Sequence, residues 1–403
     1  MMFKRMLALL TGGALLTALH PMPAGAEPVV VTKTVRENPT LFFRGIEGDS
    51  ALTKEINSFL GACGWFDLTT DPQASYTLAG SLSGTGIRLD LSMGGAPVGS
   101  WQLSAGSDSR TVAKRAVDAV LEKSFKDLKI RGFCTTRIAF CAETAPGIRN
   151  IYACDIDGGD VEQITNYNTL CVEPCWFPDG RSIGYSRYNK TGMDVIETRL
   201  QPKASRRLSS FAGINAGAAI SPDGRNLAVI LSPDHRVDLY VIPIGSTRPR
   251  RLTRSIAVEA SPCWSPDGRE IAFVSDETGV PRIHILSVDG SNRRILRPLG
   301  RDAVTPDWSS DGKIVYSTRI DGRYTVAVHD TARPGEPDVR ATTEPGNWES
   351  PAWAADNRHV VCKRSDGRKS SLYVIDTRTG KVRPLIVTPY NLSMPVWQRG
   401  RSI

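Results

Sequence analysis

The 403-residue sequence lacks several features that would place it in a specialised class of protein. No stretch approaches the roughly 20 consecutive apolar residues that a membrane-spanning helix requires, which argues against direct membrane insertion. The net charge of +8 is scattered, and no block of five like charges indicates a nucleic-acid-binding arm. What is left is an ordinary globular composition, with 40% apolar and 23% charged residues.

Motifs for metals and for covalent chemistry are also missing. The eight cysteines form no Cys-x-x-Cys pair and the five histidines lie far apart, so the pattern predicts no metal site. A Gly-x-Ser-x-Gly nucleophile elbow and a Gly-rich phosphate loop are both absent. The sequence therefore predicts no catalytic residues and no cofactor.

Residues 1–26 have the pattern of a cleavable signal peptide. Lys4 and Arg5 form a basic start, and the apolar segment 6–19 is too short to span a membrane. Ala24-Gly25-Ala26 offers small residues at the positions that a signal peptidase reads, which predicts cleavage before Glu27. Export makes disulfides possible in the mature chain.

Glycine and proline are abundant, and they mark a repeat. A Pro-x-Trp-x-Pro-Asp-Gly pattern, degenerate in places, recurs with its Asp at intervals of 44, 44, 44 and 45 residues. The copies are Pro174–Gly180, Ala218–Gly224, Pro262–Gly268, Pro306–Gly312 and Pro351–Asn357. Pro, Asp and Gly in this order favour a β-turn, and a β-branched or aromatic strand follows each copy. Two further strand patterns complete each copy, and four strands per 44 residues are typical of a propeller blade.

The number of blades follows from the two ends of the repeat. Strand patterns near 138–140, 151–156 and 161–165 have no first strand before them, and Pro395-Val-Trp397 has nothing after it. Joined, they make a sixth blade, so residues 136–397 are predicted to form a six-bladed ring that the chain ends close. The repeated tryptophans are expected to pack between neighbouring blades. They are Trp176, Trp264, Trp308, Trp353 and Trp397, and Ile220 takes the sixth place.

Residues 27–130 lack the repeat and are predicted to form a small α/β domain. Helical spacing of apolar residues occurs over 51–62, with Asp49 or Ser50 as the cap, and again from about residue 109 to 125. Segments 76–81 and 87–91 favour strands. The predicted fold is thus mainly β, a six-bladed propeller preceded by a small α/β domain. Within the ring, Cys141 and Cys154 are expected on adjacent strands, which makes them candidates for a disulfide.

Three segments resemble the TolB family, the periplasmic component of the Tol–Pal envelope system. They are Gly132–Phe140 at the domain junction, Cys63–Phe66 and Ser75–Gly80. The resemblance implies a monomeric, non-enzymatic hub of the periplasm that supports outer-membrane integrity and cell division. Its propeller would bind the peptidoglycan-associated lipoprotein Pal, and its N-terminal region a TolA-like inner-membrane protein. Residues 27–48 match the family poorly, and Ile220 and Asn357 depart from the repeat.

The resemblance also implies where the partner binds, namely at the residues just before each Pro-x-Trp. Here these are Val172, Glu173, Asn215, Ala216, Glu259, Ala260, Asp302, Trp348 and Glu349. We expect them in solvated loops that converge at one mouth of the channel and tolerate substitution. The four acidic members would give that mouth an acidic ring, with Asn215 as a hydrogen-bonding group at its centre.

Two other functions stay open at the level of sequence. The propeller could bind a glycan or a small ligand in its channel, or it could be the accessory propeller of a peptidase.

The signal-peptide pattern makes a prediction about processing. Protein recovered from the periplasm should lack residues 1–26 and begin at Glu27, because Ala24-Gly25-Ala26 suits the peptidase. Intact-mass spectrometry measures this directly, and exported protein that still carries Met1 would contradict the assignment.

Overall fold

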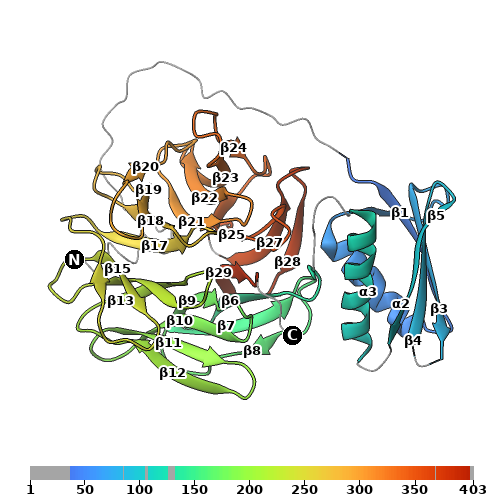
Figure 1. Ribbon diagram of the computed structural model, residues 1–403, viewed down its shortest axis with the longest axis horizontal. Helices are drawn as coiled ribbons and strands as arrows, with labels where there is room; N and C mark the ends of the chain where they lie inside the picture. The colour runs from blue at the N-terminus through green and yellow to red at the C-terminus, as the bar shows by residue number, and fades with distance from the viewer. Residues whose placement is uncertain (1–36, 85, 105–107, 126–131, 368, 400–403) are drawn as a thin grey trace. The chain divides into compact units, whose positions relative to one another are not determined.

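The computed structural model describes residues 37–84, 86–104, 108–125, 132–367 and 369–399 (Figure 1). The segment 1–26, assigned above to a signal peptide, and residues 27–36 lie outside the described residues. The chain divides into two compact units, a small α/β unit and a larger β unit, and each is described by itself.

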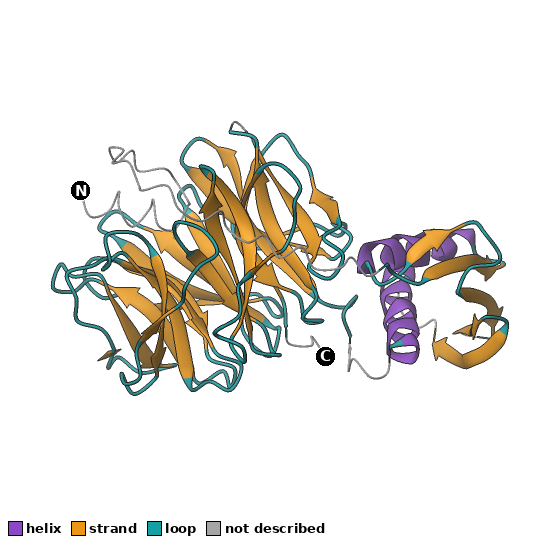
Figure 2. Cartoon of the chain, turned by 90° about the horizontal axis from the view of Figure 1, so that it is seen from above, coloured by secondary structure: helices purple, strands orange, loops and turns teal. Residues whose placement is uncertain are grey.

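The α/β unit is a five-stranded sheet with two helices. Its strands are β1 (Thr40–Glu47), β2 (Asp67–Thr69), β3 (Tyr76–Ser83), β4 (Gly86–Met93) and β5 (Ala96–Ser104), in the order β2-β1-β3-β4-β5. The helices are α2 (Ser50–Cys63) and α3 (Ser109–Ser124), and both lie on one face of the sheet (Figure 2). The predicted helices and strands are confirmed, whereas β1 and β2 had no clear sequence pattern.

Local sequence explains where α2 begins and ends. The Asp49 side chain accepts a hydrogen bond from the Leu52 amide at 2.9 Å, which satisfies one of the free amides of the first turn. Gly64 ends the helix with φ of 67°, a left-handed conformation that glycine adopts without strain. Between these caps, Ile56 and Phe59 are fully buried on the apolar face.

The β unit is a propeller of six four-stranded antiparallel sheets. Blade 1 contains β9 (Cys171–Trp176), β10 (Ser182–Tyr188), β11 (Met193–Arg199) and β12 (Ala204–Ser209). Blade 2 contains β13 (Asn215–Ile220), β14 (Asn226–Leu231), β15 (Asp238–Pro243) and β16 (Arg250–Arg251). Blade 3 contains β17 (Glu259–Trp264), β18 (Glu270–Ser275), β19 (Arg282–Ser287) and β20 (Arg294–Ile295). Blade 4 contains β21 (Val304–Trp308), β22 (Lys313–Ile320), β23 (Arg323–Asp330) and β24 (Val339–Arg340). Blade 5 contains β25 (Asn347–Trp353), β26 (His359–Ser365), β27 (Ser370–Asp376) and β28 (Val382–Ile386).

The remaining blade, here called the closing blade, joins the two ends of the repeat. Its strands are β6 (Arg137–Ala145), β7 (Ile148–Asp155), β8 (Glu162–Gln163) and β29 (Asn391–Trp397), in the order β29-β6-β7-β8. The last strand of the chain therefore supplies the first strand of the blade. This confirms the predicted closure of the ring by the chain ends.

The repeated Asp-Gly segment makes the turn between the first and second strands of each blade. Asp223 accepts hydrogen bonds from the Ser221 hydroxyl and the Arg225 amide, which tightens the turn. Gly224 follows with φ of 72°. In blade 5 Asn357 takes this place with φ of 55°, which asparagine tolerates better than other residues with a side chain.

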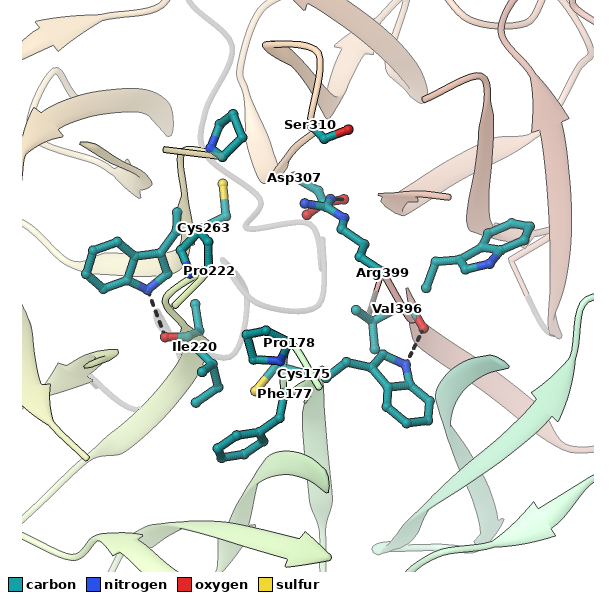
Figure 3. A pocket seen from close by; sticks show the side chains of 15 residues that line it. Cys175, Phe177, Pro178, Ile220, Pro222, Cys263, Asp307, Ser310, Val396 and Arg399 are labelled. Atoms are coloured by element: carbon teal, nitrogen blue, oxygen red, sulfur yellow. Dashed lines mark hydrogen bonds and ion pairs between the residues drawn. The ribbon is translucent and has the colours of Figure 1, made fainter. Parts of the chain in front are cut away.

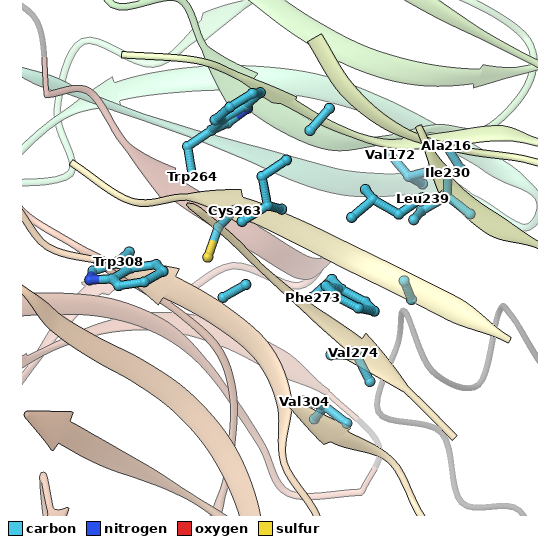
Figure 4. Packing of buried hydrophobic residues seen from close by; sticks show 14 of the residues in the cluster. Val172, Ala216, Ile230, Leu239, Cys263, Trp264, Phe273, Val274, Val304 and Trp308 are labelled. Atoms are coloured by element: carbon cyan, nitrogen blue, oxygen red, sulfur yellow. The ribbon is translucent and has the colours of Figure 1, made fainter. Parts of the chain in front are cut away.

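The tryptophans at the ends of the innermost strands are buried between blades, as predicted. The five are at most 9% exposed. Figure 4 shows Trp264 and Trp308 among apolar side chains such as Phe273 and Val304 from neighbouring blades. No described helix is long and apolar enough to cross a membrane.

Burial of Trp397 predicts a large cost for its removal. Trp397→Ala should lower the free energy of unfolding by about 3–5 kcal/mol, because it leaves a cavity beside the closing strand. Ile295→Ala, at a half-exposed side chain on the outer strand of blade 3, is the matched control and should change little. Urea denaturation followed by circular dichroism gives both values, and equal midpoints would show that the end of the chain does not hold the ring together.

Candidate functional site: the two mouths of the propeller channel

Each innermost strand carries a left-handed residue immediately before the Pro-x-Trp segment or its equivalent. In all six blades φ lies between 50° and 62°, and in blades 1 to 5 the pairing with the second strand shifts register there. The six residues are Glu173, Gly217, Ser261, Thr305, Ser350 and Met394. This is a β-bulge, and the proline that follows it in five blades has no amide hydrogen to leave unpaired.

The channel has two ends, which are named here by the connections that surround them. The loops that enter each first strand, together with the loops between second and third strands, open at the end here called the loop mouth. The Asp-Gly turns open at the other end, here called the turn mouth. Proline within the first strand of each copy, an edge strand of its sheet, is the sequence signal that would have indicated a bulge there in advance.

The nine predicted partner-binding residues lie at the loop mouth, but not in solvated loops. Eight of them belong to the strands β9, β13, β17 and β25, and Asp302 lies two residues before the start of β21. All are buried except Glu173, which is half-buried. The expectation of exposed loop positions is therefore wrong, because the strands β9, β13, β17 and β25 begin before the bulge and take eight of these residues into the ladder. That these residues take part in partner binding stays a prediction.

Asn215 shapes a loop from within. Its Oδ1 accepts hydrogen bonds from the Ser209 hydroxyl at 2.6 Å and the Phe211 amide at 2.8 Å, and its Nδ2 donates to the Phe211 carbonyl at 2.6 Å. These bonds fix the chain between β12 and β13. A fully buried side chain with this pattern is a structural support, so it offers no group to a partner at the centre of the mouth.

Glu259 is the most unusual of the buried acids. Its Oε2 accepts hydrogen bonds from the Leu239 amide at 2.9 Å and from the Thr253 hydroxyl, whereas its Oε1 has no partner among the described residues. Burial, reinforced by the nearby charge of Asp238, raises the pKa of Glu259 to about 7. The carboxyl group is therefore half protonated near neutral pH.

The same cluster holds the loop between β16 and β17. Asp238 accepts a hydrogen bond from the Ser255 amide at 3.2 Å and pairs with Arg251, and the Thr253 hydroxyl lies between Asp238 and Glu259. On this loop Ile256 is 98% exposed. The buried acids thus support a fixed loop that presents an apolar side chain to solvent.

The other three acids are also turned toward internal partners. Glu173 accepts hydrogen bonds from the Gly217 amide of the next blade and from the Ser186 hydroxyl, both at 2.8 Å. Asp302 pairs with Arg319 at 3.4 Å, and Glu349 with Lys363 at 2.6 Å. The predicted acidic ring is therefore not an exposed feature of the mouth. These carboxylates connect strands and neighbouring blades instead.

Trp348 is a core residue rather than an exposed anchor. Its Nε1 donates to the Glu344 carbonyl at 2.9 Å, and its ring meets the Tyr373 ring edge-on at 5.6 Å between centroids. The Arg364 guanidinium lies 5.2 Å from its ring centroid. The predicted Val172, Ala216 and Ala260 are likewise part of the apolar core.

The exposed apolar side chains of the loop mouth were missed by the motif argument. Besides Ile256, they are Val387, 64% exposed, and Tyr390, 49% exposed, both on the loop between β28 and β29. The signal available in the sequence was an apolar residue flanked by polar ones in a segment between strands. The periodicity of apolar residues cannot distinguish a single exposed residue of this kind from a residue of a short buried strand.

The turn mouth holds a cavity of about 320 Å³ (Figure 3). Prolines of three Asp-Gly turns, Pro178, Pro222 and Pro266, line it together with Ile220 and Phe177. Cys175 and Cys263 face it from the channel wall, and burial raises the pKa of both thiols, so they stay protonated.

A single ion pair lies on the other side of the same cavity. Arg399 pairs with Asp307 and also donates to the Trp308 carbonyl, and Asp307 accepts a hydrogen bond from the Trp353 amide at 2.7 Å. Figure 3 shows Arg399 reaching toward Asp307 opposite Ile220 and Phe177. The cavity is thus apolar on one side and charged on the other.

The cysteines do not support the proposed disulfide. Cys141 is a free thiol, so the suggested pair with Cys154 is not formed. Among the described residues, no group of three or more His, Cys, Asp or Glu side chains is arranged to hold a metal ion.

Comparison with known proteins gives a consistent result. Residues 126–400 match the family model described as the TolB beta propeller domain. The Tol-Pal system protein TolB of Desulfosudis oleivorans is 30% identical over 135 residues, which are 34% of this chain and 30% of that protein. The Tol-Pal system protein TolB of Alcanivorax borkumensis is 40% identical over 81 residues, 20% of this chain and 19% of that protein. The matches thus span less than a third of the length of these curated relatives.

The fold similarity extends further than the sequence similarity. The crystal structure of TolB from Acinetobacter baumannii superimposes with a TM-score of 0.81 at 19% identity, and covers 91% of this chain and 98% of that one. Nearly the whole chain therefore shares its fold with that protein.

The raised pKa of Glu259 predicts a pH-dependent stability. Because the folded-state pKa of about 7 exceeds the ordinary 4.5, the contribution of Glu259 to the free energy of unfolding should be largest below pH 4.5 and should be lost as pH rises through 7. The full decrease is about 3 kcal/mol at 1.36 kcal/mol per pH unit. Glu259→Gln should remove most of this slope between pH 5 and 8.

Glu336→Gln, at an exposed glutamate, is the matched control and should keep the wild-type slope. Urea denaturation at a series of pH values measures both variants. A Glu259→Gln protein with the full slope would mean that another group titrates.

Proposed function

The chain belongs to the TolB beta propeller domain family, and we propose that it acts in the periplasm as a protein-interaction component of the Tol–Pal system. Its main partner would be a peptidoglycan-associated lipoprotein, bound by the propeller in support of outer-membrane integrity and cell division. The names of the curated relatives support this role. The chain would act without catalysis, as a monomer that engages several envelope proteins.

We place the lipoprotein at the loop mouth because of what its loops expose. Ile256 projects from a loop whose amides donate to the buried Asp238 and the half-buried Asp276, so the backbone that carries it is held in place before a partner arrives. A fixed apolar side chain loses little conformational freedom on binding, which favours affinity. Val387 and Tyr390 expose further apolar surface on a loop of the same kind.

The buried acids at this mouth would act through the loops rather than by contact. Glu259 and Asp238 hold the loop that carries Ile256, and Asn215 holds the loop before β13. The predicted residues thus become positioning residues in the proposal. We therefore no longer expect these positions to tolerate substitution. An arginine at Asn215 or Glu259 would be buried without a partner and would destabilise the fold.

The α/β unit is proposed to engage a TolA-like inner-membrane protein. Residues 27–48, which match the family poorly, are not assigned to this contact; they are described only from residue 37, and β1 forms most of that part.

Ile256→Glu tests the location of the lipoprotein site. A central interface contact typically costs about 2 kcal/mol or more when lost, so the affinity for the soluble domain of the cognate lipoprotein should fall by about thirtyfold. Isothermal titration calorimetry with the full mature chain measures it. The matched control is Ile295→Glu, at a half-exposed isoleucine on an outer strand, which should bind like wild type.

Two outcomes would count against the proposal in different ways. If Ile256→Glu binds at wild-type affinity, the site lies on another surface. If the wild-type chain does not bind the lipoprotein at all, the partner itself is wrong.

A further inference from the structure

The cavity at the turn mouth coincides with the one place where the repeat loses its tryptophan. Five innermost strands end in a tryptophan that is at most 9% exposed. In blade 2 the equivalent residue is Ile220, which is half-buried and lines the cavity. The exchange of an indole for a smaller side chain leaves volume unfilled beside Ile220, in a cavity that residues of blades 1 to 4 and of the closing blade line together.

The repeated indoles make a specific hydrogen bond as well as filling space. Trp176 Nε1 donates to the Val396 carbonyl at 3.2 Å, and Trp264 Nε1 donates to the Ala219 carbonyl at 3.0 Å (Figure 3). In both cases the acceptor is the channel-lining residue of the preceding blade, immediately before the strand-end position. The equivalent acceptor for a tryptophan at position 220 is the carbonyl of Cys175, which lines the same cavity.

The remaining walls suit a flat aromatic ring. Phe177, Pro178 and Pro222 supply apolar surface around Ile220, and the neutral thiol of Cys175 adds to it. Across the cavity, the Arg399 guanidinium is fixed by Asp307 and is only 38% exposed. Arginine is the side chain that most often lies over aromatic faces. The volume of about 320 Å³ is at the lower end of the range for small-ligand sites.

From these observations we propose that the cavity at the turn mouth binds an indole group, the same group that the repeat itself places in the other five blades. The ring would pack against Ile220, Phe177 and the turn prolines, and its N–H would donate to the Cys175 carbonyl. An aliphatic group could fill the volume but would offer that carbonyl no donor. This site lies at the opposite end of the channel from the proposed lipoprotein site, so either can fail without the other.

The direct test is binding of N-acetyl-tryptophanamide to the full mature chain, measured by calorimetry and by saturation-transfer NMR. We expect saturable binding, and at least about tenfold weaker binding of N-acetyl-phenylalaninamide, which lacks the ring N–H. Ile220→Trp should fill the cavity with the chain's own indole and reduce binding by more than about tenfold. Ile220→Leu, which keeps the volume, is the matched control and should bind like wild type.

A second variant keeps the test decisive if Ile220→Trp does not fold. Ile220→Phe narrows the cavity with a smaller ring and should also weaken binding. Free indole distinguishes the source of the group, since equal affinity for indole points to a small molecule and tighter binding of the amide points to a tryptophan in a polypeptide. The proposal is overturned if wild type shows no saturable binding, if the phenylalanine amide binds equally well, or if a folded variant with an aromatic residue at 220 binds like wild type.

Discussion

The pairing of the last strand with the first described strand of the ring is the constraint on which the propeller depends. β29 comes from the end of the repeat and β6 from its beginning, and together they make the closing blade. Because a propeller blade packs only against its two neighbours, five blades without this pairing would leave two open faces. The buried Trp397 lies at the end of the same strand, so hydrogen bonding and packing close the ring together.

A closed ring explains why the loop mouth is built from buried polar groups. The innermost strands bulge at one level, and the bulge leaves backbone amides that the ladder cannot satisfy. Side chains of neighbouring segments supply the acceptors: Glu173 accepts from the Gly217 amide and Ser317 from the Ser350 amide, and in the loop before β13 Asn215 accepts from the Phe211 amide in the same way. Carboxylates at these positions are retained within the structure at a cost in desolvation, which the raised pKa of Glu259 records. Hydrogen bonds to these buried side chains hold the loops of the loop mouth in defined conformations.

The sequence predicted the architecture well because the architecture rests on short-range chemistry. Asp-Gly turns, β-branched strands and a fixed 44-residue interval are local signals, and six copies reinforce one another. The sequence predicted where the candidate site residues lie along the chain, but it did not predict that they are buried. A side chain such as Glu259 is charged in any sequence-based account, whereas in the structure it is buried beside Thr253 of the preceding loop and Asp238 of the neighbouring blade, which come together only when blades 2 and 3 pack. The same limit applies to Ile256, since an isolated apolar residue in a loop carries no periodic signal.

The two mouths differ in a way that follows from the repeat itself. Turns of similar length and sequence build much of the turn mouth, where the variation includes single substitutions such as Ile220 for tryptophan and Phe177 beside it. Loops of different length and sequence build the loop mouth, where they present a broad and varied surface with Ile256 and Tyr390 exposed. A broad surface suits a folded protein partner, whereas one missing side chain in a tightly repeated frame leaves a pocket about the size of a single aromatic group. With both proposed sites, one strand pattern repeated six times would provide two kinds of recognition at opposite ends of one channel.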